Sequence, residues 1–311
     1  MTFSCLDLCS GAGGQALGLE NAGFEIVGVV ERDTDPARTL STNRPGWQVQ
    51  QIDIRSKGWC TRYRGVDLLS AGAPCTPFSS AGRQAGRHDS RDVLLDVLDV
   101  IDFVAPRWVL MENVPALLSD RFAPYLSNLL ERLRRGGYAT ALHLLRGTDV
   151  GVPQKRIRLV VLGCRGSSVL GLARPAVRES RLLTVGQAVS DLMAADGWPG
   201  ADAWARLANS PAPTIVGGSR LHGGPDLGPS RTKAAWARLA VDGRSVADRP
   251  PTPSDPRNHI PRLTLRMLAR LQDFPDEWKF SGSKTSVFRQ IGNAFPPSMA
   301  EAAGRVLLAS I

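Results

Sequence analysis

The run Asp7-Leu8-Cys9-Ser10-Gly11-Ala12-Gly13-Gly14 decides the fold, because it connects a predicted strand to a predicted helix through a glycine-rich turn. Apolar residues predict the strand over residues 3–8, and residues 15–22 read as a helix. Glycines at such a turn let the backbone approach a bound ligand. The run therefore indicates a ligand site at the end of the first strand of an α/β fold.

Strand-like and helix-like segments alternate from residue 3 to residue 165. This order predicts a doubly wound, mostly parallel, Rossmann-like sheet covered by helices. The predicted strands are residues 3–8, 26–31, 66–70, 108–112, 139–145 and 159–163, and the predicted helices are residues 15–22, 36–43, 93–103 and 125–135.

Two acidic positions extend the ligand site. Glu31 ends the second predicted strand, about twenty residues after the turn, where a carboxylate can accept both hydroxyls of a ribose. Asp53-Ile54 adds an acidic side chain beside an apolar one, which suits the edge and face of an adenine. These residues fit a nucleoside cofactor without distinguishing a dinucleotide from S-adenosylmethionine. The turn departs from G-x-G-x-x-G, which disfavours a nicotinamide cofactor only modestly.

A candidate nucleophile follows the third predicted strand, in Gly72-Ala73-Pro74-Cys75-Thr76-Pro77-Phe78-Ser79. A lone cysteine is more often a packed thiol than a nucleophile. Here Glu112 follows a buried strand, and period-2 alternation predicts Arg156 and Arg158 on one face of another. A thiol, a carboxylate and two guanidinium groups suit attack on an electron-poor ring such as a pyrimidine.

The amino-acid composition changes between about residues 165 and 255, where glycine and proline are frequent. Helical runs at residues 185–193 and 233–239, with three tryptophans, favour a small folded domain over a linker. An amphipathic helix ending at Leu271 and a last helix over residues 297–309 follow. We predict one domain from residues 1–165 plus 284–311 and a second, loop-rich domain from residues 166–283.

Composition limits the partners. Lys+Arg 38 against Asp+Glu 29 gives a net charge of +9 and a pI near 9.9, which favours a polyanionic partner. Five cysteines, an odd number, predict a reducing compartment and no disulfide framework. No zinc-ligand spacing, signal peptide or membrane-spanning run is found, so we expect a soluble, cytoplasmic protein without a metal.

The ordered motifs together resemble the bacterial DNA (cytosine-5) methyltransferases, which depend on S-adenosylmethionine. The motifs that carry the resemblance are residues 7–14, Glu31, Asp53-Ile54, Pro74-Cys75, Glu112-Asn113-Val114, and residues 154–158, 262–275 and 290–293. The resemblance implies an S-adenosylmethionine domain that the C-terminal helix completes, and a target-recognition domain inserted before Arg262. It also implies that duplex DNA lies between the two domains and that the target cytosine is flipped out of the duplex.

The resemblance also implies roles at the substrate. Cys75 matches the nucleophile that adds to carbon 6 of cytosine, and Glu112 matches the carboxyl group that binds ring nitrogen 3 and the exocyclic amine. Arg158, and with it Arg156, matches the pair that holds the 2-carbonyl oxygen. Ser79 is retained from the nucleophile motif, and residues 80–91 resemble a catalytic loop that closes over DNA.

Eleven residues fall at positions that resemble the family's cofactor pocket: Cys9, Gly11, Ala12, Gly14, Glu31, Asp53, Ile54, Pro74, Leu94, Asn293 and Ala294. Two positions depart from the family pattern. Cys9 stands where a phenylalanine usually stacks on adenine, and Thr76 stands where glutamine is commoner.

Three alternatives remain open. An RNA cytosine-5 methyltransferase of the same fold is disfavoured because no Cys-Phe-Thr tripeptide occurs. A catalytically silent DNA-binding regulator is disfavoured because Cys75 and Glu112 are both present, and a nicotinamide oxidoreductase would leave them without a joint role. The expected partner is double-stranded DNA, with no membrane and no metal. We also expect a cognate restriction endonuclease that forms no stable complex with this protein. We expect the protein itself to be a monomer.

Overall fold

The computed structural model describes residues 2–74, 93–166, 182–218 and 224–310. Contacts divide the chain into two compact units. The first unit contains Met1–Leu145, Ile157–Ala176 and Met299–Ile311, and the second contains Arg146–Arg156 and Val177–Ser298. Each unit is described by itself below.

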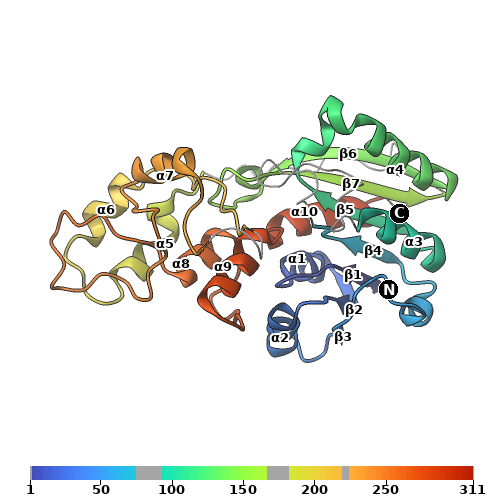
Figure 1. Cartoon of the computed structure of the whole chain (residues 1–311), viewed down its shortest axis with the longest axis horizontal. Helices are drawn as coiled ribbons and strands as arrows, with labels where there is room; N and C mark the ends of the chain where they lie inside the picture. Colours follow the sequence, from blue (N-terminus) through green and yellow to red (C-terminus); the bar gives the residue numbers. More distant parts are fainter. Residues whose placement is uncertain (1, 75–92, 167–181, 219–223, 311) are drawn as a thin grey trace. The chain divides into compact units, whose positions relative to one another are not determined.

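The first unit contains a seven-stranded sheet in the order β3-β2-β1-β4-β5-β7-β6 (Figure 1). β1, β2, β3, β4 and β5 pair in parallel, and β7 pairs antiparallel with β5. This arrangement confirms the predicted α/β fold with a mostly parallel sheet. The strands are β1 (Phe3–Leu8), β2 (Phe24–Val30), β3 (Val49–Gln50), β4 (Leu68–Ala71), β5 (Trp108–Asn113), β6 (Tyr138–Arg146) and β7 (Ile157–Arg165).

Helices cover the sheet because its central strands are apolar on both faces. On one face, Leu8, Leu69 and Met111 belong to the same buried cluster as residues of two helices, α3 and α4. Alternate residues point to the other face. The helices are α1 (Gly14–Ala22), α2 (Thr34–Asn43), α3 (Leu94–Val104), α4 (Ala123–Arg135) and, at the C-terminal end, α10 (Pro297–Leu308).

The second unit is helical where it is regular. Three of its tryptophans, Trp198, Trp204 and Trp236, are buried. The indole of Trp198 donates to the carbonyl of Pro256 at 3.0 Å, and that of Trp204 donates to Ala240 at 3.0 Å, so these rings tie loops to the helices. The helices are α5 (Val185–Ala194), α6 (Ala201–Leu207), α7 (Ser230–Ala237), α8 (Leu265–Leu271) and α9 (Lys284–Asn293).

The sequence-based segments agree with the structure to within about two or three residues at most boundaries, but one strand and two α-helices of the described residues were not predicted. These are the two-residue strand β3, the short helix α6 and the helix α9. Contacts group residues 146–156 and 284–298 with the second unit, whereas the sequence assigned them to the first domain. The domain boundaries stay a prediction. Among the described residues, no helix is long and apolar enough to cross a membrane.

Candidate active site

The glycine-rich turn after β1 leaves its backbone open to a ligand. Cys9, Gly11 and Gly13 have positive φ angles of 54°, 54° and 89°. The Ser10 amide donates to the carbonyl of Val30 at 3.1 Å, which fixes the turn on the neighbouring strand. A Cβ atom built at Gly11 would meet nothing within 4 Å, so space lies beside this residue. α1 begins directly after the turn, at Gly14.

Glu31 is held against this turn by two backbone N–H groups. The Gly11 amide donates to Oε2 of Glu31 at 2.9 Å, and the Asp33 amide donates to Oε1 at 2.7 Å. Burial raises the pKa of Glu31, while the hydrogen bonds from Asp33 and Gly11 lower it. The carboxylate has a fixed orientation beside the turn, and its remaining lone pairs suit the two hydroxyls of a ribose.

Asp53 and Ile54 follow β3 in the same unit. Asp53 is half-exposed, with its Oδ2 atom 3.7 Å from a guanidinium nitrogen of Arg32 and its Oδ1 atom accepting from the Arg55 amide at 3.0 Å. Ile54 is buried. A partly exposed carboxylate therefore stands next to a buried apolar side chain.

The other predicted cofactor residues are distributed over both units. Ala12 and Leu94 are buried and Pro74 is exposed in the first unit, whereas Asn293 and Ala294 end α9 in the second. Asn293 is exposed.

Cys9 takes the place at which the resemblance implies an aromatic ring. Burial, and then the negative charge of Glu31, raise the pKa of the Cys9 thiol well above its usual range. A thiol that stays protonated behaves as a small apolar group. Cys5, Cys9, Cys60 and Cys164, the described cysteines, are all free.

Glu112 and Arg158 form a buried ion pair. The Arg158 Nε atom lies 2.7 Å from Oε1 of Glu112, and the two side chains are 13% and 10% exposed. Antiparallel register places Glu112 opposite Val160, so Arg158, two residues earlier on β7, is its diagonal neighbour on the same face. The structure thus brings together the carboxylate and one of the two arginines predicted from sequence.

The segment that leads to Cys75 consists of β4 and residues 72–74; we call it the stem. It lies beside β5, the strand that carries Glu112. Ala71, the last residue of β4, pairs with Met111 on β5, so Glu112 comes directly after that pair. The Gly72 amide then donates to the carbonyl of Leu8 at 3.1 Å. Cys75 and Ser79, with the predicted loop over residues 80–91, lie outside the described residues; only Val93 onward is described again.

Arg156 differs from its predicted geometry. It precedes β7 and belongs to the second unit, so the expectation that it shares a strand face with Arg158 is wrong. Its buried guanidinium donates to three main-chain carbonyls, those of Ile215, Gly292 and Ala294, at 2.9, 3.0 and 2.9 Å. Strand alternation cannot apply to a residue outside the strand. Arg156 connects the end of α9 to a loop of its own unit.

Gln154 is a buried residue of this network that sequence reasoning left out of the site. Its Nε2 atom donates to Oε1 of Gln272 at 2.7 Å, and its Oε1 atom accepts from the Ile215 amide at 3.0 Å. Gln272 in turn donates to the carbonyl of Ala294 at 2.6 Å. The signal available was a polar residue two positions before Arg156, in a motif that carries the family resemblance.

We expect Arg156→Lys to lower the free energy of unfolding by about 3 kcal/mol, because an ammonium group cannot reach three carbonyls and charged hydrogen bonds contribute about 1.5–3 kcal/mol each. Urea unfolding measures this change. Arg146→Lys, at an exposed arginine of the same unit, is the control and should change stability by less than about 0.5 kcal/mol. A fall in turnover at unchanged stability would instead favour a contact between Arg156 and the substrate.

Asp7 forms a second buried polar network, between β1, α1 and β4. Its Oδ1 atom accepts from Nε2 of Gln15 at 2.9 Å and from the hydroxyl of Ser70, the residue that faces it on β4. Burial raises the pKa of Asp7 from 3.8 to about 6, against the hydrogen bonds from Ser70, Ser10 and Gln15, which lower it. The network links the helix that follows the glycine turn to the strand that leads to Cys75.

The raised pKa of Asp7 predicts a pH dependence of stability. The folded protein holds this proton more tightly than the unfolded chain, so the contribution of Asp7 is fully present below pH 3.8 and is lost as the pH rises through about 6. The total is about 3 kcal/mol, at about 1.4 kcal/mol for each unit of pKa. Urea unfolding between pH 4.5 and 8 should show the wild-type free energy falling relative to Asp7→Asn up to about pH 6. A constant difference would contradict the raised pKa.

Among the described residues, no group of three or more His, Cys, Asp or Glu side chains is gathered in a way that could hold a metal ion. In the first unit, the described side chains offer a carboxylate held by a guanidinium at β5 and β7 and, two strands away in the sheet, a glycine-rich turn that holds a second carboxylate.

Known proteins are similar to this chain along almost its whole length. The family model for C-5 cytosine-specific DNA methylase matches residues 3–309. Type II methyltransferase M.NaeI of Lentzea aerocolonigenes is 46% identical over 313 residues, which cover 100% of this chain and 76% of the relative. Type II methyltransferase M.NgoMIV of Neisseria gonorrhoeae is 37% identical over 322 residues, covering 100% and 99% of the two chains.

Solved structures share the fold at low identity. A DNA modification methyltransferase encoded within a prophage (E. coli) superposes with a TM-score of 0.68 at 23% identity and covers 99% of both chains. The Dnmt2 methyltransferase of S. pombe has a TM-score of 0.63 at 19% identity, covering 99% of this chain and 98% of its own.

Proposed function

This chain belongs to the C-5 cytosine-specific DNA methylase family, and we propose that it transfers a methyl group from S-adenosylmethionine to carbon 5 of a cytosine flipped out of a specific duplex sequence. The observation that carries this proposal is the buried pair of Glu112 and Arg158, because it stands beside the stem that leads to Cys75. A carboxylate, a guanidinium and a thiol are the groups needed to activate a pyrimidine ring.

The residues of the glycine turn fit S-adenosylmethionine. Space lies beside Gly11, and the carboxylate of Glu31 is fixed next to it by backbone amides. Glu31 would hold the ribose, Asp53 and Ile54 would contact the adenine, and Asn293 and Ala294 are further proposed ligands. When bound, S-adenosylmethionine supplies a sulfonium methyl group.

The proposed chemistry begins at carbon 6 of the cytosine, which stacking shields in a duplex, so the base must leave the stack. The Cys75 thiolate adds to carbon 6 while Glu112 binds ring nitrogen 3 and the exocyclic amine, which makes the ring more electron-poor. The electron pair that reaches carbon 5 then takes the methyl group. Loss of the proton from carbon 5 and expulsion of the Cys75 thiolate restore the ring.

Arg158 has two tasks in this proposal. Its Nε atom orients the Glu112 carboxylate through the 2.7 Å contact, and its guanidinium holds the 2-carbonyl oxygen of cytosine. The pair is almost fully buried, so removing either charge would leave the other in a site of low dielectric constant. We propose Glu112 and Arg158 as a preformed half of the active site.

The biological setting follows from the relatives, which are named Type II methyltransferases. We propose that this protein is the modification enzyme of a restriction-modification system or an orphan DNA methylase. A cognate endonuclease would read the same sequence without forming a stable complex with this chain, and the methyltransferase would act as a monomer.

Transfer of labelled methyl from S-adenosylmethionine tests the proposed function. The acceptors are unmethylated duplex DNA, transfer RNA and a reaction without nucleic acid, and bisulfite sequencing then locates any modified cytosine. We expect label on DNA cytosines within one recurring sequence. Label on transfer RNA would contradict the proposed substrate, and no label on either would contradict the proposed reaction.

A further inference from the structure

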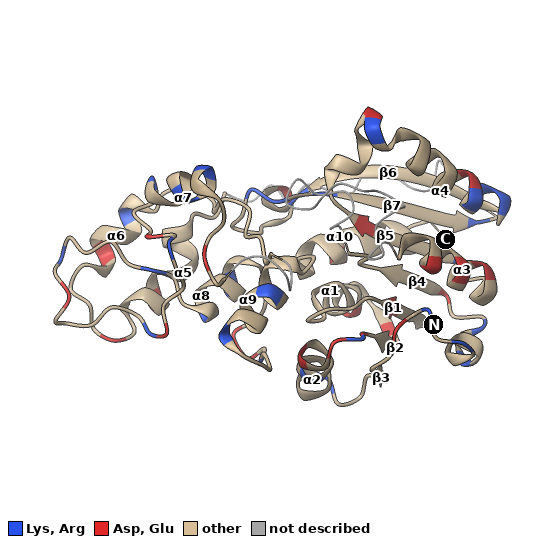
Figure 2. Cartoon of the chain, in the orientation of Figure 1, with Lys and Arg blue, Asp and Glu red and all other residues tan. Residues whose placement is uncertain are grey.

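Positive charge is concentrated in the second unit. Residues 146–156 and 177–298 contain Lys+Arg 19 against Asp+Glu 12, so the unit carries +7 of the net charge of +9. Figure 2 shows lysines and arginines along α7 and α9 of this unit. Charge of this kind attracts polyanions but does not by itself identify a binding site.

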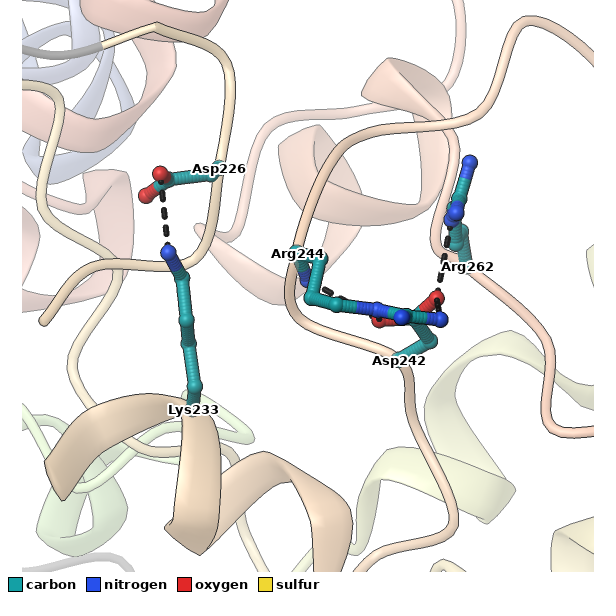
Figure 3. Close-up of polar contacts among 5 residues, drawn as sticks. All are labelled: Asp226, Lys233, Asp242, Arg244 and Arg262. Atoms are coloured by element: carbon teal, nitrogen blue, oxygen red, sulfur yellow. Dashed lines mark hydrogen bonds and ion pairs between the residues drawn. The ribbon is translucent and has the colours of Figure 1, made fainter. Parts of the chain in front are cut away.

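One carboxylate in this unit holds two arginines. Oδ1 of Asp242 accepts from the backbone amide and Nε of Arg244, at 3.0 and 2.9 Å, and Oδ2 accepts from a terminal nitrogen of Arg244 and from Nε of Arg262, both at 3.0 Å (Figure 3). Asp242 is 12% exposed, whereas Arg244 and Arg262 are 78% and 46% exposed. These hydrogen bonds hold the pKa of Asp242 below its usual range.

A neighbouring lysine is paired with a different carboxylate. Lys233 on α7 lies 3.0 Å from the carboxylate of Asp226. A Cβ atom built at Gly243, between Asp242 and Arg244, would lie 3.3 Å from the side chains of both Leu227 and Lys233. The Leu227 amide also donates to the carbonyl of Gly243 at 3.0 Å. Gly243 therefore lies close to α7, whereas the Lys233 side chain extends from this helix toward Asp226 and away from Arg244 and Arg262 (Figure 3).

We propose that Arg244 and Arg262 form a phosphate-binding site for the backbone of duplex DNA, with Asp242 positioning the two arginines. This inference rests on the proposed function, since it assigns a contact to the DNA substrate. It names the backbone phosphates as the ligand, so the site contributes affinity that is independent of base sequence.

The charge balance of the cluster supports an anion as its ligand. Asp242 carries one negative charge and contacts two guanidinium groups, so a net positive charge remains at the exposed side. Asp242 accepts from Nε and one terminal nitrogen of Arg244 and from Nε of Arg262, so each guanidinium group keeps further N–H donors that Asp242 does not use. Because the carboxylate already holds the guanidinium groups, less side-chain entropy is lost when a phosphate binds.

The test compares the salt dependence of duplex binding in Arg244→Gln, Arg262→Gln, the double variant and the wild type. The matched control is Arg305→Gln, because Arg305 is a 63% exposed arginine of the first unit, ion-paired to Glu301. When the logarithm of the binding constant is plotted against the logarithm of the salt concentration, each phosphate contact contributes about −0.9 to the slope. Each single variant should therefore lose about 0.9 of slope and about eightfold in affinity at 0.1 M salt, equally for target and non-target duplexes.

The outcomes separate this inference from the proposed function. A wild type that methylates DNA, with Arg244→Gln and Arg262→Gln slopes equal to that of Arg305→Gln, would overturn the phosphate site alone. Weaker binding confined to the target duplex would also overturn it, because it would indicate base reading. A wild type that neither binds nor methylates DNA would overturn both proposals. Circular dichroism and thermal unfolding of each exposed-site variant verify that its fold is unchanged.

Discussion

Replacing Cys75 by serine is expected to lower the rate of methyl transfer by at least about 10³-fold while duplex binding stays close to wild type. The addition to carbon 6 needs a thiolate, which forms from a group with a reference pKa of about 8.5. A serine hydroxyl is far less acidic and far less nucleophilic in water. Single-turnover transfer of labelled methyl, together with a duplex-binding titration, measures both parts of the expectation.

Cys60→Ser provides the control for the cysteine substitution. Cys60 is a free, partly buried thiol that packs against the core of the first unit and belongs to none of the motifs of the site. We expect its serine variant to transfer methyl at a rate within about threefold of wild type, since a partly buried thiol acts as a small apolar group. If Cys75→Ser kept a comparable rate, Cys75 would not be the nucleophile.

Glu112→Gln is expected to lower the rate by about 10²–10⁴-fold, because the amide keeps the shape of the side chain but removes its proton-accepting charge. The structure adds a second effect. Arg158 would lose its buried counter-charge, and breaking a buried pair costs about 3–5 kcal/mol of stability. Single-turnover rates must therefore be compared at a temperature where urea unfolding shows the variant to be folded.

Two comparisons separate the catalytic effect from the structural one. Glu131→Gln removes a glutamate that pairs with exposed arginines on α4 and should change neither rate nor stability appreciably. Arg158→Lys keeps the positive charge beside Glu112 and should retain more stability than activity, since an ammonium group cannot form two directed contacts. A Glu112→Gln rate near wild type would remove the carboxylate from the chemistry.

The sheet was predictable because its buried strands are continuous apolar runs. Trp108–Asn113 is buried along its whole length, and the sequence placed this strand to within one residue. The helix α9 escaped prediction because its first turn follows the polar run Ser281-Gly282-Ser283 and it mixes polar with apolar residues. Its cap, in which Ser283 accepts from the Ser286 amide, was the available signal.

The candidate site was predictable in its residue types but not in its contacts. The pairing of Glu112 with Arg158 depends on the antiparallel placement of β7 beside β5, which strand periodicity does not determine. The partners of Arg156 are carbonyls of residues 215, 292 and 294, which lie 59 to 138 positions away in sequence. No local pattern predicts contacts of that separation.

Covalent trapping provides the sharpest test of the proposed reaction. A duplex that contains 5-fluorodeoxycytidine in place of every cytosine cannot lose a proton from carbon 5 after methyl transfer, so elimination of the thiolate is blocked. Incubation with S-adenosylmethionine should give a complex that survives denaturation, and peptide mapping should place the modified nucleotide on Cys75. Cys75→Ser should give none. Methyl transfer to ordinary DNA without a trapped complex, or attachment at another residue, would contradict catalysis through a Cys75 adduct.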